Sequence, residues 1–234
     1  MGEGQSSSEA PLLEEVQSGT SEWGTVDALV QSSGSRYATH YRSSLRMTRL
    51  WKVRPSPVLS DYRRRAEKLG PPTQLFHGTG LQNVQSIATE GFRLPGHAGM
   101  FGKGVYFADC PLKSANHCHD RDGSSWTSFL YTWSTKGLAA AVKPTKQVGK
   151  GQMLLCDVYL GRTRELRRPC QTFEPQDDLK GGAFSELLGL GDYDSVYAPG
   201  GHWFWTAVRV PEYVVYRPEQ AIPRYVVEFR RLRT

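Results

Sequence analysis

Four blocks of this sequence combine residue types that can bind and polarise a flat, polar ligand. In the first block His77 is followed by Gly78, and a residue without a Cβ lets its backbone N–H and C=O approach a planar group closely. A primary carboxamide, which has one acceptor and two donor hydrogens, suits that pair of backbone groups. By itself, however, a His at a strand end followed by Gly is more often structural than functional.

The second block runs from Gly99 to Asp109 and is rich in glycine. Its glycines follow neither the Gly-x-Gly-x-x-Gly spacing of dinucleotide sites nor the Gly-Lys-Ser/Thr ending of a triphosphate-binding loop. Tyr106 follows the glycine turn on an expected strand, where its ring can form one wall of a slot for a flat ligand. Core packing is the alternative role for this ring.

The third and fourth blocks add polar and charged groups. Lys113 suits a phosphate or a ribose, Ser114 can donate to a carboxamide oxygen, and His117 can stack on a ring. Lys and Ser at the start of a helix are, however, usually a solvated charge and a cap. Glu212 precedes the apolar run Tyr-Val-Val-Tyr, which predicts a partly solvated carboxylate, although a Glu at a strand end usually faces solvent.

Strands and a few short helices are expected to position these blocks. Apolar alternation and continuous apolar runs predict strands at 47–53, 74–77, 104–107, 153–160, 212–216 and 222–231. Caps and stop signals predict helices at 60–69, capped by Ser60, at 82–90, closed by Gly91, and from 111 to 119. Residues 37–45 and 193–197 are weaker strand candidates, 161–211 is expected to be mainly loop, and 120–150 carries aromatic residues without a clear pattern.

Many strands, few helices and no regular strand–helix alternation argue against a doubly wound sheet and predict an α+β fold built on antiparallel sheets. The 234 residues are enough for one large domain with a sizeable core. Residues 1–22 are rich in Gly, Ser and Glu, which predicts a disordered acidic tail. The sequence has no apolar run of about 18 residues, so no membrane span is expected.

The charge of the chain is unevenly distributed. Residues 1–25 contain five Glu and no Lys or Arg, so the remainder holds all 29 basic groups against 18 of the 23 acidic ones. A basic body attracts polyanions such as a dinucleotide or a nucleic acid. A solvated basic surface without such a partner is the alternative.

The chain has four cysteines, Cys110, Cys118, Cys156 and Cys170. They form no dense framework, which favours a reducing, intracellular compartment. His117 and His119 crowd the same segment as two of these thiols, but zinc sites usually use Cys-x2–4-Cys pairs. We therefore expect the thiols to be buried as small apolar groups, and no bound metal.

Together and in this order, the blocks resemble the catalytic domain of the poly(ADP-ribose) polymerase family, with tankyrase-like members as near relatives. The family's His-Gly-Thr, Gly-Lys-Gly-aliphatic-Tyr-Phe-Ala-Asp, Lys-Ser-Ala-Asn and Glu-Tyr-aliphatic-Val-Tyr stand at 77–79, 102–109, 113–116 and 212–216. The resemblance covers about residues 40–234. It implies the ADP-ribosyltransferase fold, in which two mainly antiparallel sheets pack together with flanking helices, and a catalytic domain over 23–234.

The resemblance also implies NAD+ as co-substrate and a role for each residue of the first block. His77 would bond the adenosine ribose, and Gly78 would hold the nicotinamide amide through its backbone. Ser114 would add a side-chain hydrogen bond to the same amide, and Thr79 belongs to the same cofactor-binding block.

The remaining implied roles concern the nicotinamide and its ribose. Tyr106 would stack on the nicotinamide ring, and Glu212 would bond a hydroxyl of the nicotinamide ribose, with Lys113 as a secondary electrostatic helper. His77, Tyr106 and Glu212 would thus be the catalytic residues. His117 stands where the family commonly has a second stacking Tyr, and a smaller, titratable ring there leaves the pocket shape open.

The implied reaction cleaves the nicotinamide–ribose bond and transfers ADP-ribose to side chains of proteins, of other chains or of this one, once or as a polymer. A carboxylate beside the developing positive charge stabilises it. Two alternatives stay open: a catalytically inactive module that binds ADP-ribose or a protein on the same fold, and a transferase acting on nucleic acid ends, for which the sequence shows no motif. The place of action would be intracellular, in the cytoplasm or the nucleus.

Overall fold

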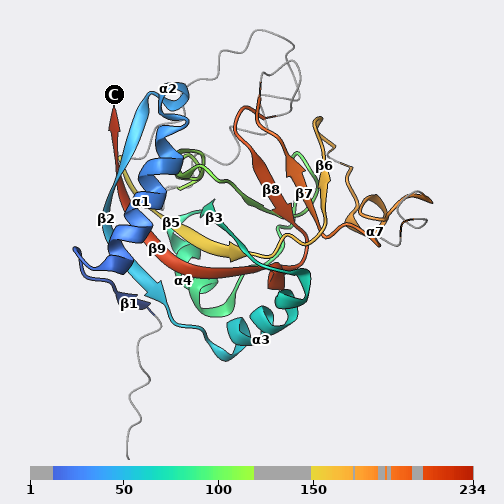
Figure 1. Cartoon of the computed structure of the whole chain (residues 1–234), viewed down its shortest axis with the longest axis horizontal. Helices are drawn as coiled ribbons and strands as arrows, with labels where there is room; N and C mark the ends of the chain where they lie inside the picture. Colours follow the sequence, from blue (N-terminus) through green and yellow to red (C-terminus); the bar gives the residue numbers. More distant parts are fainter. Residues whose placement is uncertain are drawn as a thin grey trace, which may run out of the picture.

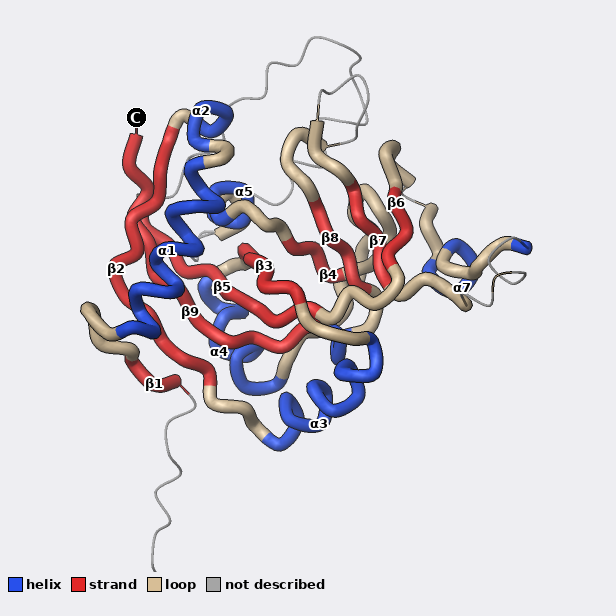
Figure 2. The backbone as a smooth tube through the Cα atoms, viewed as in Figure 1, coloured by secondary structure: helices blue, strands red, loops and turns tan. Residues whose placement is uncertain are grey.

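The computed structural model describes residues 13–118, 149–170, 172–183, 188, 191–201 and 208–233 of the chain. Its strands form two sheets (Figure 1, Figure 2). The five-stranded sheet contains, in order, β1 (Leu13–Glu15), β2 (Ser43–Val53), β9 (Ala221–Arg233), β5 (Lys150–Val158) and β3 (Thr73–Gly78). The four-stranded sheet contains β4 (Val105–Phe107), β8 (Glu212–Val215), β7 (Ser195–Ala198) and β6 (Thr163–Glu165).

The helices are short apart from the first. They are α1 (Ser21–Ser35), α2 (Ala38–Tyr41), α3 (Pro57–Ala66), α4 (Leu81–Glu90), α5 (Pro111–Ala115) and α7 (Pro175–Asp178), with 3-10 turns η1 (Glu67–Leu69) and η2 (Pro218–Gln220). Among the described strand pairs only β6–β7 is parallel. Two mainly antiparallel sheets with flanking helices confirm the predicted α+β fold.

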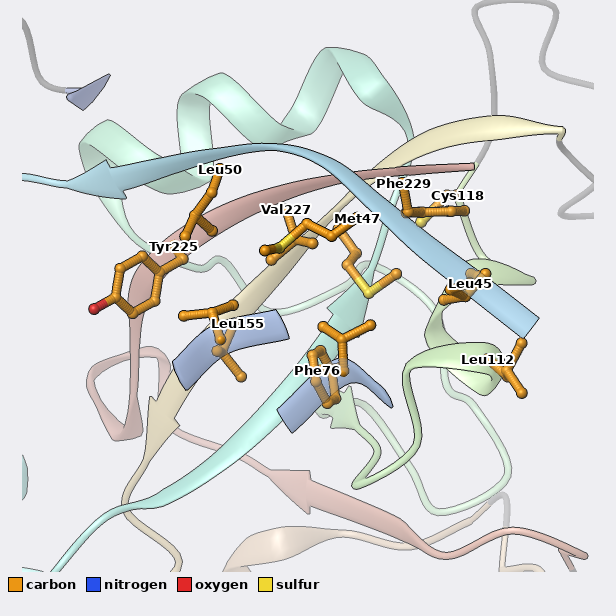
Figure 3. Packing of buried hydrophobic residues seen from close by; sticks show 14 of the residues in the cluster. Leu45, Met47, Leu50, Phe76, Leu112, Cys118, Leu155, Tyr225, Val227 and Phe229 are labelled. Carbon is orange, nitrogen blue, oxygen red and sulfur yellow. The ribbon is translucent and has the colours of Figure 1, made fainter. Parts of the chain in front are cut away.

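One core lies between the five-stranded sheet and α1, which crosses that sheet (Figure 1). Met47 of β2, Phe229 of β9 and Phe76 of β3 belong to this core, as does Leu112 of α5 (Figure 3). Val30 of α1 completes the contact and is almost fully buried.

A second core lies on the opposite face of the same sheet. Leu154 of β5 and Val226 of β9 pack there against Leu59 of α3 and Val84 of α4. Phe107 of β4 belongs to this cluster as well, so the second core also joins the two sheets.

The spacing of apolar residues in β2 follows from an irregularity in its pairing. Leu45, Met47 and Leu50 all belong to the core beneath α1, although strict alternation would place Arg49 there. The register with β9 shifts between Met47 and Arg49, and the extra residue returns Leu50 to the buried face. The predicted strand at 47–53 is therefore confirmed but begins four residues earlier.

Of the two predicted helix ends, the structure confirms one and corrects the other. Gly91 closes α4 with a φ of 85°, a conformation that glycine adopts without strain, as predicted. The predicted cap of α3 at Ser60 is wrong. Ser56 caps this helix by accepting from the Leu59 N–H, because Pro57 fits the first helical position.

Ordered structure begins before the predicted boundary at residue 23. Residues 13–15 form β1, paired with β2, and Thr20 caps α1 by accepting from the Trp23 N–H. The disordered tail predicted over 1–22 is thus wrong for 13–22, while residues 1–12 lie outside the described part. The sequence does not predict α1, because Gly and Ser interrupt the periodic spacing of its apolar residues. The helix is stabilised mainly by packing of its apolar residues onto the sheet.

The rest of the expected organisation fits the described ranges. The weak strand candidate at 193–197 is β7, and β6, α7 and β7 are the helices and strands of the described residues within 161–201. The candidate at 37–45 is α2 followed by the start of β2. Almost all of 120–150 lies outside the described residues, as does His119.

The cysteines are free thiols. Cys110, Cys118 and Cys156 are buried, as predicted, and Cys170 is half-buried. Within the described ranges, no three metal-ligating side chains come together. None of the helices described is long and apolar enough to cross a membrane.

We expect Leu154→Ala to lower the free energy of unfolding by about 2–5 kcal/mol, because it opens a cavity where the sheet meets α3, α4 and the second sheet. Leu232→Ala, at a leucine of β9 that is 45% exposed, is the matched control and should change stability by less than about 0.5 kcal/mol. Denaturant unfolding of both variants measures this. Equal losses would contradict the assignment of the second core.

Candidate active site

The end of β3 is joined to the segment that follows β4. Phe76 and Ala108 exchange two backbone hydrogen bonds, N to O at 2.8 and 3.0 Å. These bonds link the edge of the five-stranded sheet to the four-stranded sheet. Because His77 follows Phe76 and Tyr106 lies two residues before Ala108, the first two blocks meet at this junction.

His77 bonds directly to the second block. Its Nδ1 lies 2.8 Å from the carbonyl oxygen of Tyr106. A carbonyl only accepts, so Nδ1 carries the hydrogen and Nε2 of the neutral ring is left as an acceptor. The edge of the ring faces Phe92, with centroids 5.0 Å apart, and Phe107 lies at 5.4 Å.

Burial lowers the pKa of His77 to about 4, and the nearby His117 contributes in the same direction. The hydrogen bond to the Tyr106 carbonyl opposes both effects without overcoming them. The imidazole is therefore neutral at physiological pH, in the tautomer that offers Nε2 as an acceptor.

The Tyr106 ring is fixed through its hydroxyl. That oxygen accepts from the Phe101 N–H at 2.8 Å and donates to the Gly102 carbonyl at 3.0 Å. A Cβ on Gly99 would lie only 2.5 Å from the same hydroxyl, so the glycine loop can close around it. Burial raises the pKa of Tyr106, so the phenol stays protonated and can donate to the Gly102 carbonyl.

Strand register places Glu212 on the same side of the four-stranded sheet as Tyr106. Tyr106 of β4 is opposite Val214 of β8, and Glu212 lies two residues before Val214. Residues two apart in a strand share a face. The carboxylate and the aromatic ring are therefore diagonal neighbours on adjacent strands.

Glu212 forms a buried ion pair with Lys113. Lys113 Nζ lies 2.9 Å from Glu212 Oε1, and each side chain is 13% exposed. The same ammonium donates to the Val210 carbonyl at 2.7 Å. Burial lowers the pKa of Lys113, and the Glu212 carboxylate works against that shift.

Gly78 touches the helix that carries Lys113. A Cβ at Gly78 would lie 1.8 Å from the Ser114 carbonyl oxygen and 3.1 Å from His117 Cβ, so only glycine fits. Ser114 is 3% exposed, and its hydroxyl has no hydrogen-bond partner among the described residues. The close contact brings Gly78, Ser114 and His117 to one place, as their assignment to one site requires.

Gly78 also presents its backbone to the outside of the sheet. β3 is an edge strand, and Phe76 makes its bonds to Ala108 on the side away from β5. In an antiparallel strand, residues two apart direct both N–H and C=O to the same side. The N–H and C=O of Gly78 therefore face away from β5, as a planar amide ligand would need.

Thr79 has a local role. Its hydroxyl oxygen accepts from Asn83 Nδ2 at 3.1 Å, across the first turn of α4. The Thr79 side chain is thus bonded to the helix that follows it in the chain.

Sequence reasoning missed several residues that hold the site together. The Val210 carbonyl anchors Lys113, and Phe92 packs on His77, but neither carries a motif. Asp109 ends the second block and had no assigned role. It pairs with Arg36 at 3.2 Å and so ties the end of α1 to the strand carrying Tyr106.

Comparison with known proteins identifies a family. The family profile described as poly(ADP-ribose) polymerase catalytic domain matches residues 20–183, which include His77 and Tyr106 and end before Glu212. Poly [ADP-ribose] polymerase 2 of Arabidopsis thaliana is 30% identical over 177 residues, covering 67% of this chain and 23% of the relative. Poly [ADP-ribose] polymerase 1 of Oryza sativa subsp. japonica is 26% identical over 212 residues, covering 82% of this chain and 19% of the relative.

A shorter segment is more similar to a vertebrate protein. Poly [ADP-ribose] polymerase 1 of Danio rerio is 38% identical over 87 residues, which cover 35% of this chain and 8% of the relative. The chain thus spans less than a quarter of the length of each of these three relatives.

We expect His77 to stay neutral down to about pH 4 in the folded protein. The unfolded chain protonates the same residue near pH 6.5, so between about pH 6.5 and 4 unfolding takes up a proton. The free energy of unfolding should therefore fall as the pH is lowered through this window, by about 3 kcal/mol from this group.

Histidine proton NMR measures the titration, and His77→Gln identifies the signal. The variant should also lose this part of the pH dependence of unfolding. A titration midpoint near 6.5 in the folded protein would contradict the partly buried, neutral imidazole.

Proposed function

Because the chain belongs to the poly(ADP-ribose) polymerase catalytic-domain family, we propose that it transfers ADP-ribose from NAD+ to protein side chains. The catalytic domain in this proposal is the predicted 23–234, extended at its start to include β1 and the whole of α1, which pack on the five-stranded sheet. The observation that carries the proposal is the buried Lys113–Glu212 pair on the sheet face of Tyr106. Burying two charges costs several kcal/mol, which supports a role that needs a fixed carboxylate rather than simple binding.

The residues at the end of β3 fit the nicotinamide amide of NAD+. The outward N–H and C=O of Gly78 supply one donor and one acceptor, which match a primary carboxamide. The Ser114 hydroxyl lies on the helix turn that touches Gly78 and can donate to the amide oxygen. His117 stands beside both and would form a wall of the slot.

The neutral His77 fits the adenosine ribose. Its Nε2 accepts, because Nδ1 already donates to the Tyr106 carbonyl. A ribose hydroxyl is a suitable donor. The lowered pKa of His77 keeps this acceptor available at physiological pH.

Tyr106 and Glu212 would act where the glycosidic bond breaks. NAD+ supplies an electrophilic ribose carbon and a nicotinamide leaving group that takes the bonding electron pair. The Tyr106 ring, held by its hydroxyl, would hold the nicotinamide flat as it leaves. The Glu212 carboxylate would accept from a hydroxyl of the same ribose and stabilise the positive charge that develops there.

Lys113 would position that carboxylate. The ammonium uses one donor on Glu212 and one on the Val210 carbonyl, which leaves the second carboxylate oxygen for the ribose. The acceptor of the transfer loses a proton as its nucleophilic atom bonds to the ribose carbon. Protein side chains, of this or other chains, are the proposed acceptors, and the four free thiols support action in a reducing, intracellular compartment.

We expect Glu212→Gln to reduce nicotinamide release from NAD+ on the order of 100-fold or more, because the amide keeps the shape but loses the charge. Lys113 can still donate to the Gln oxygen, so binding of nicotinamide analogues should change little. Glu90→Gln, at an exposed glutamate paired with Arg93, is the matched control and should leave turnover unchanged. Near wild-type release by Glu212→Gln would refute the catalytic assignment, and wild-type protein that binds NAD+ without releasing nicotinamide would identify a binding module.

Benzamide should raise the melting temperature, because it matches the amide contacts of Gly78 and Ser114 and binds only the folded state. At a concentration of about 100 times its Kd it adds about 2.7 kcal/mol to the free energy of unfolding. Benzoate is the chemical control, because its carboxylate has no N–H to donate and should produce no comparable shift. No shift with saturating benzamide, or equal shifts with both compounds, would contradict the proposed slot.

A further inference from the structure

Three cations stand side by side on three adjacent strands of the five-stranded sheet. In the register of this sheet Arg46 of β2 is opposite Arg230 of β9, and Arg230 is opposite Lys150 of β5. Neighbouring strands lie about 4.8 Å apart, so the three stems fall within about 10 Å along one line. We call these three residues the cation row.

The cation row is unfavourable for the folded sheet itself. Like charges directly opposite each other on neighbouring strands repel and destabilise the pairing. The adjacent carboxylate, Glu228, accepts from Thr48 at 2.9 Å and from Lys150 at 3.3 Å and is 8% exposed. Within the described part of the chain, Arg46 and Arg230 have no ion-pair partner.

Three other arginines on or beside the strands of this sheet have a carboxylate partner. Arg49 pairs with Glu15, Arg54 with Glu14 and Arg224 with Asp157. Local violations of charge patterning of this kind are expected where function requires them. An anionic partner bound to the unpaired guanidinium groups of the cation row would relieve this repulsion.

The cation row is accessible. Arg46 and Arg230 are exposed, and the Lys150 side chain is 60% exposed. The start of β2 and the end of β9 lie at the end of the sheet away from α3 (Figure 1).

The cation row shares a sheet face with the proposed NAD+ site. Lys150 and Leu154 lie an even number of residues apart in β5, and Leu154 is opposite His77 of β3. Lys150 is therefore on the His77 face, about 13 Å along the strand at about 3.3 Å per residue. A chain bound across the row would lie within reach of the site without occupying it.

We propose that the cation row binds the phosphodiester backbone of a single-stranded nucleic acid. Two guanidinium groups with free donors suit phosphate, which they bind through paired hydrogen bonds. A single line of cations matches one backbone with one charge per nucleotide. The excess of 29 basic over 18 acidic groups after residue 25 favours such a polyanion over an acidic protein segment with interrupted charge. This binding does not depend on ADP-ribose transfer.

Fluorescence anisotropy of a labelled oligothymidylate, titrated with the full chain at several salt concentrations and without NAD+, tests the proposal. Each phosphate contact of a single strand contributes about −0.7 to the slope of log Kobs against log salt concentration. Arg46→Ser/Arg230→Ser should therefore make the slope shallower by about 1.4. Melting temperature should stay equal or rise at low salt, because a repulsion is removed.

Arg64→Ser/Arg65→Ser is the matched control. It removes the same charge from α3, where both arginines pair with Asp61, and should leave the slope unchanged. Equal losses in both double variants would show attraction by net charge alone and overturn the proposal. So would the absence of wild-type binding at low salt, or polyglutamate of equal charge competing as well as unlabelled oligothymidylate.

Discussion

The buried ion pair between Lys113 and Glu212 is the interaction on which the site depends. α5, which carries Lys113, packs on the five-stranded sheet, whereas Glu212 begins a strand of the other sheet. The 2.9 Å contact therefore joins the helix turn that touches Gly78 to the strand that carries the carboxylate, in addition to the backbone bonds between Phe76 and Ala108. Removing one partner of a buried ion pair lowers the free energy of unfolding by about 3–5 kcal/mol, because the other charge is left without a partner.

Two geometric rules of β-structure then place the remaining groups. Alternation along β4 and β8 brings Tyr106 to the face of Glu212. The position of β3 at a sheet edge turns the backbone of Gly78 outward, because Phe76 is already bonded to Ala108 on that side. The proposed slot thus consists of one backbone edge, one fixed ring and one fixed charge, with little need for side chains to move on binding.

The family and the fold class could be predicted from the sequence because four short motifs stand in one order and strand patterns lie around them. Gly78 was identified as a position for close ligand approach, and the structure adds that a Cβ there would strike the Ser114 carbonyl. The sequence did not predict the Val210 carbonyl beneath Lys113, which lies 97 residues away and has no side-chain signature. Such partners depend on how loops return to the sheet.

The missed helix α1 illustrates the same limit at the level of the fold. Its residues 21–35 include Gly24, Gly34 and several Ser, which weaken helix propensity and apolar periodicity. Val26 and Val30 form the helix by packing against the five-stranded sheet, and Asp109 holds its end through Arg36. The stability of α1 therefore comes from tertiary contacts rather than from local helix propensity, and the sequence of the segment contains no pattern that predicts those contacts.

A double-mutant cycle on Lys113 and Glu212 tests the central claim most directly. Single-turnover nicotinamide release would be measured for Lys113→Met, Glu212→Gln and the double variant, each shown to be folded by its melting curve. If Lys113 acts by positioning Glu212, the double variant should lose no more activity than Glu212→Gln alone, with an interaction energy above about 1 kcal/mol. Losses that simply multiply would show that the two residues act independently and would contradict the account.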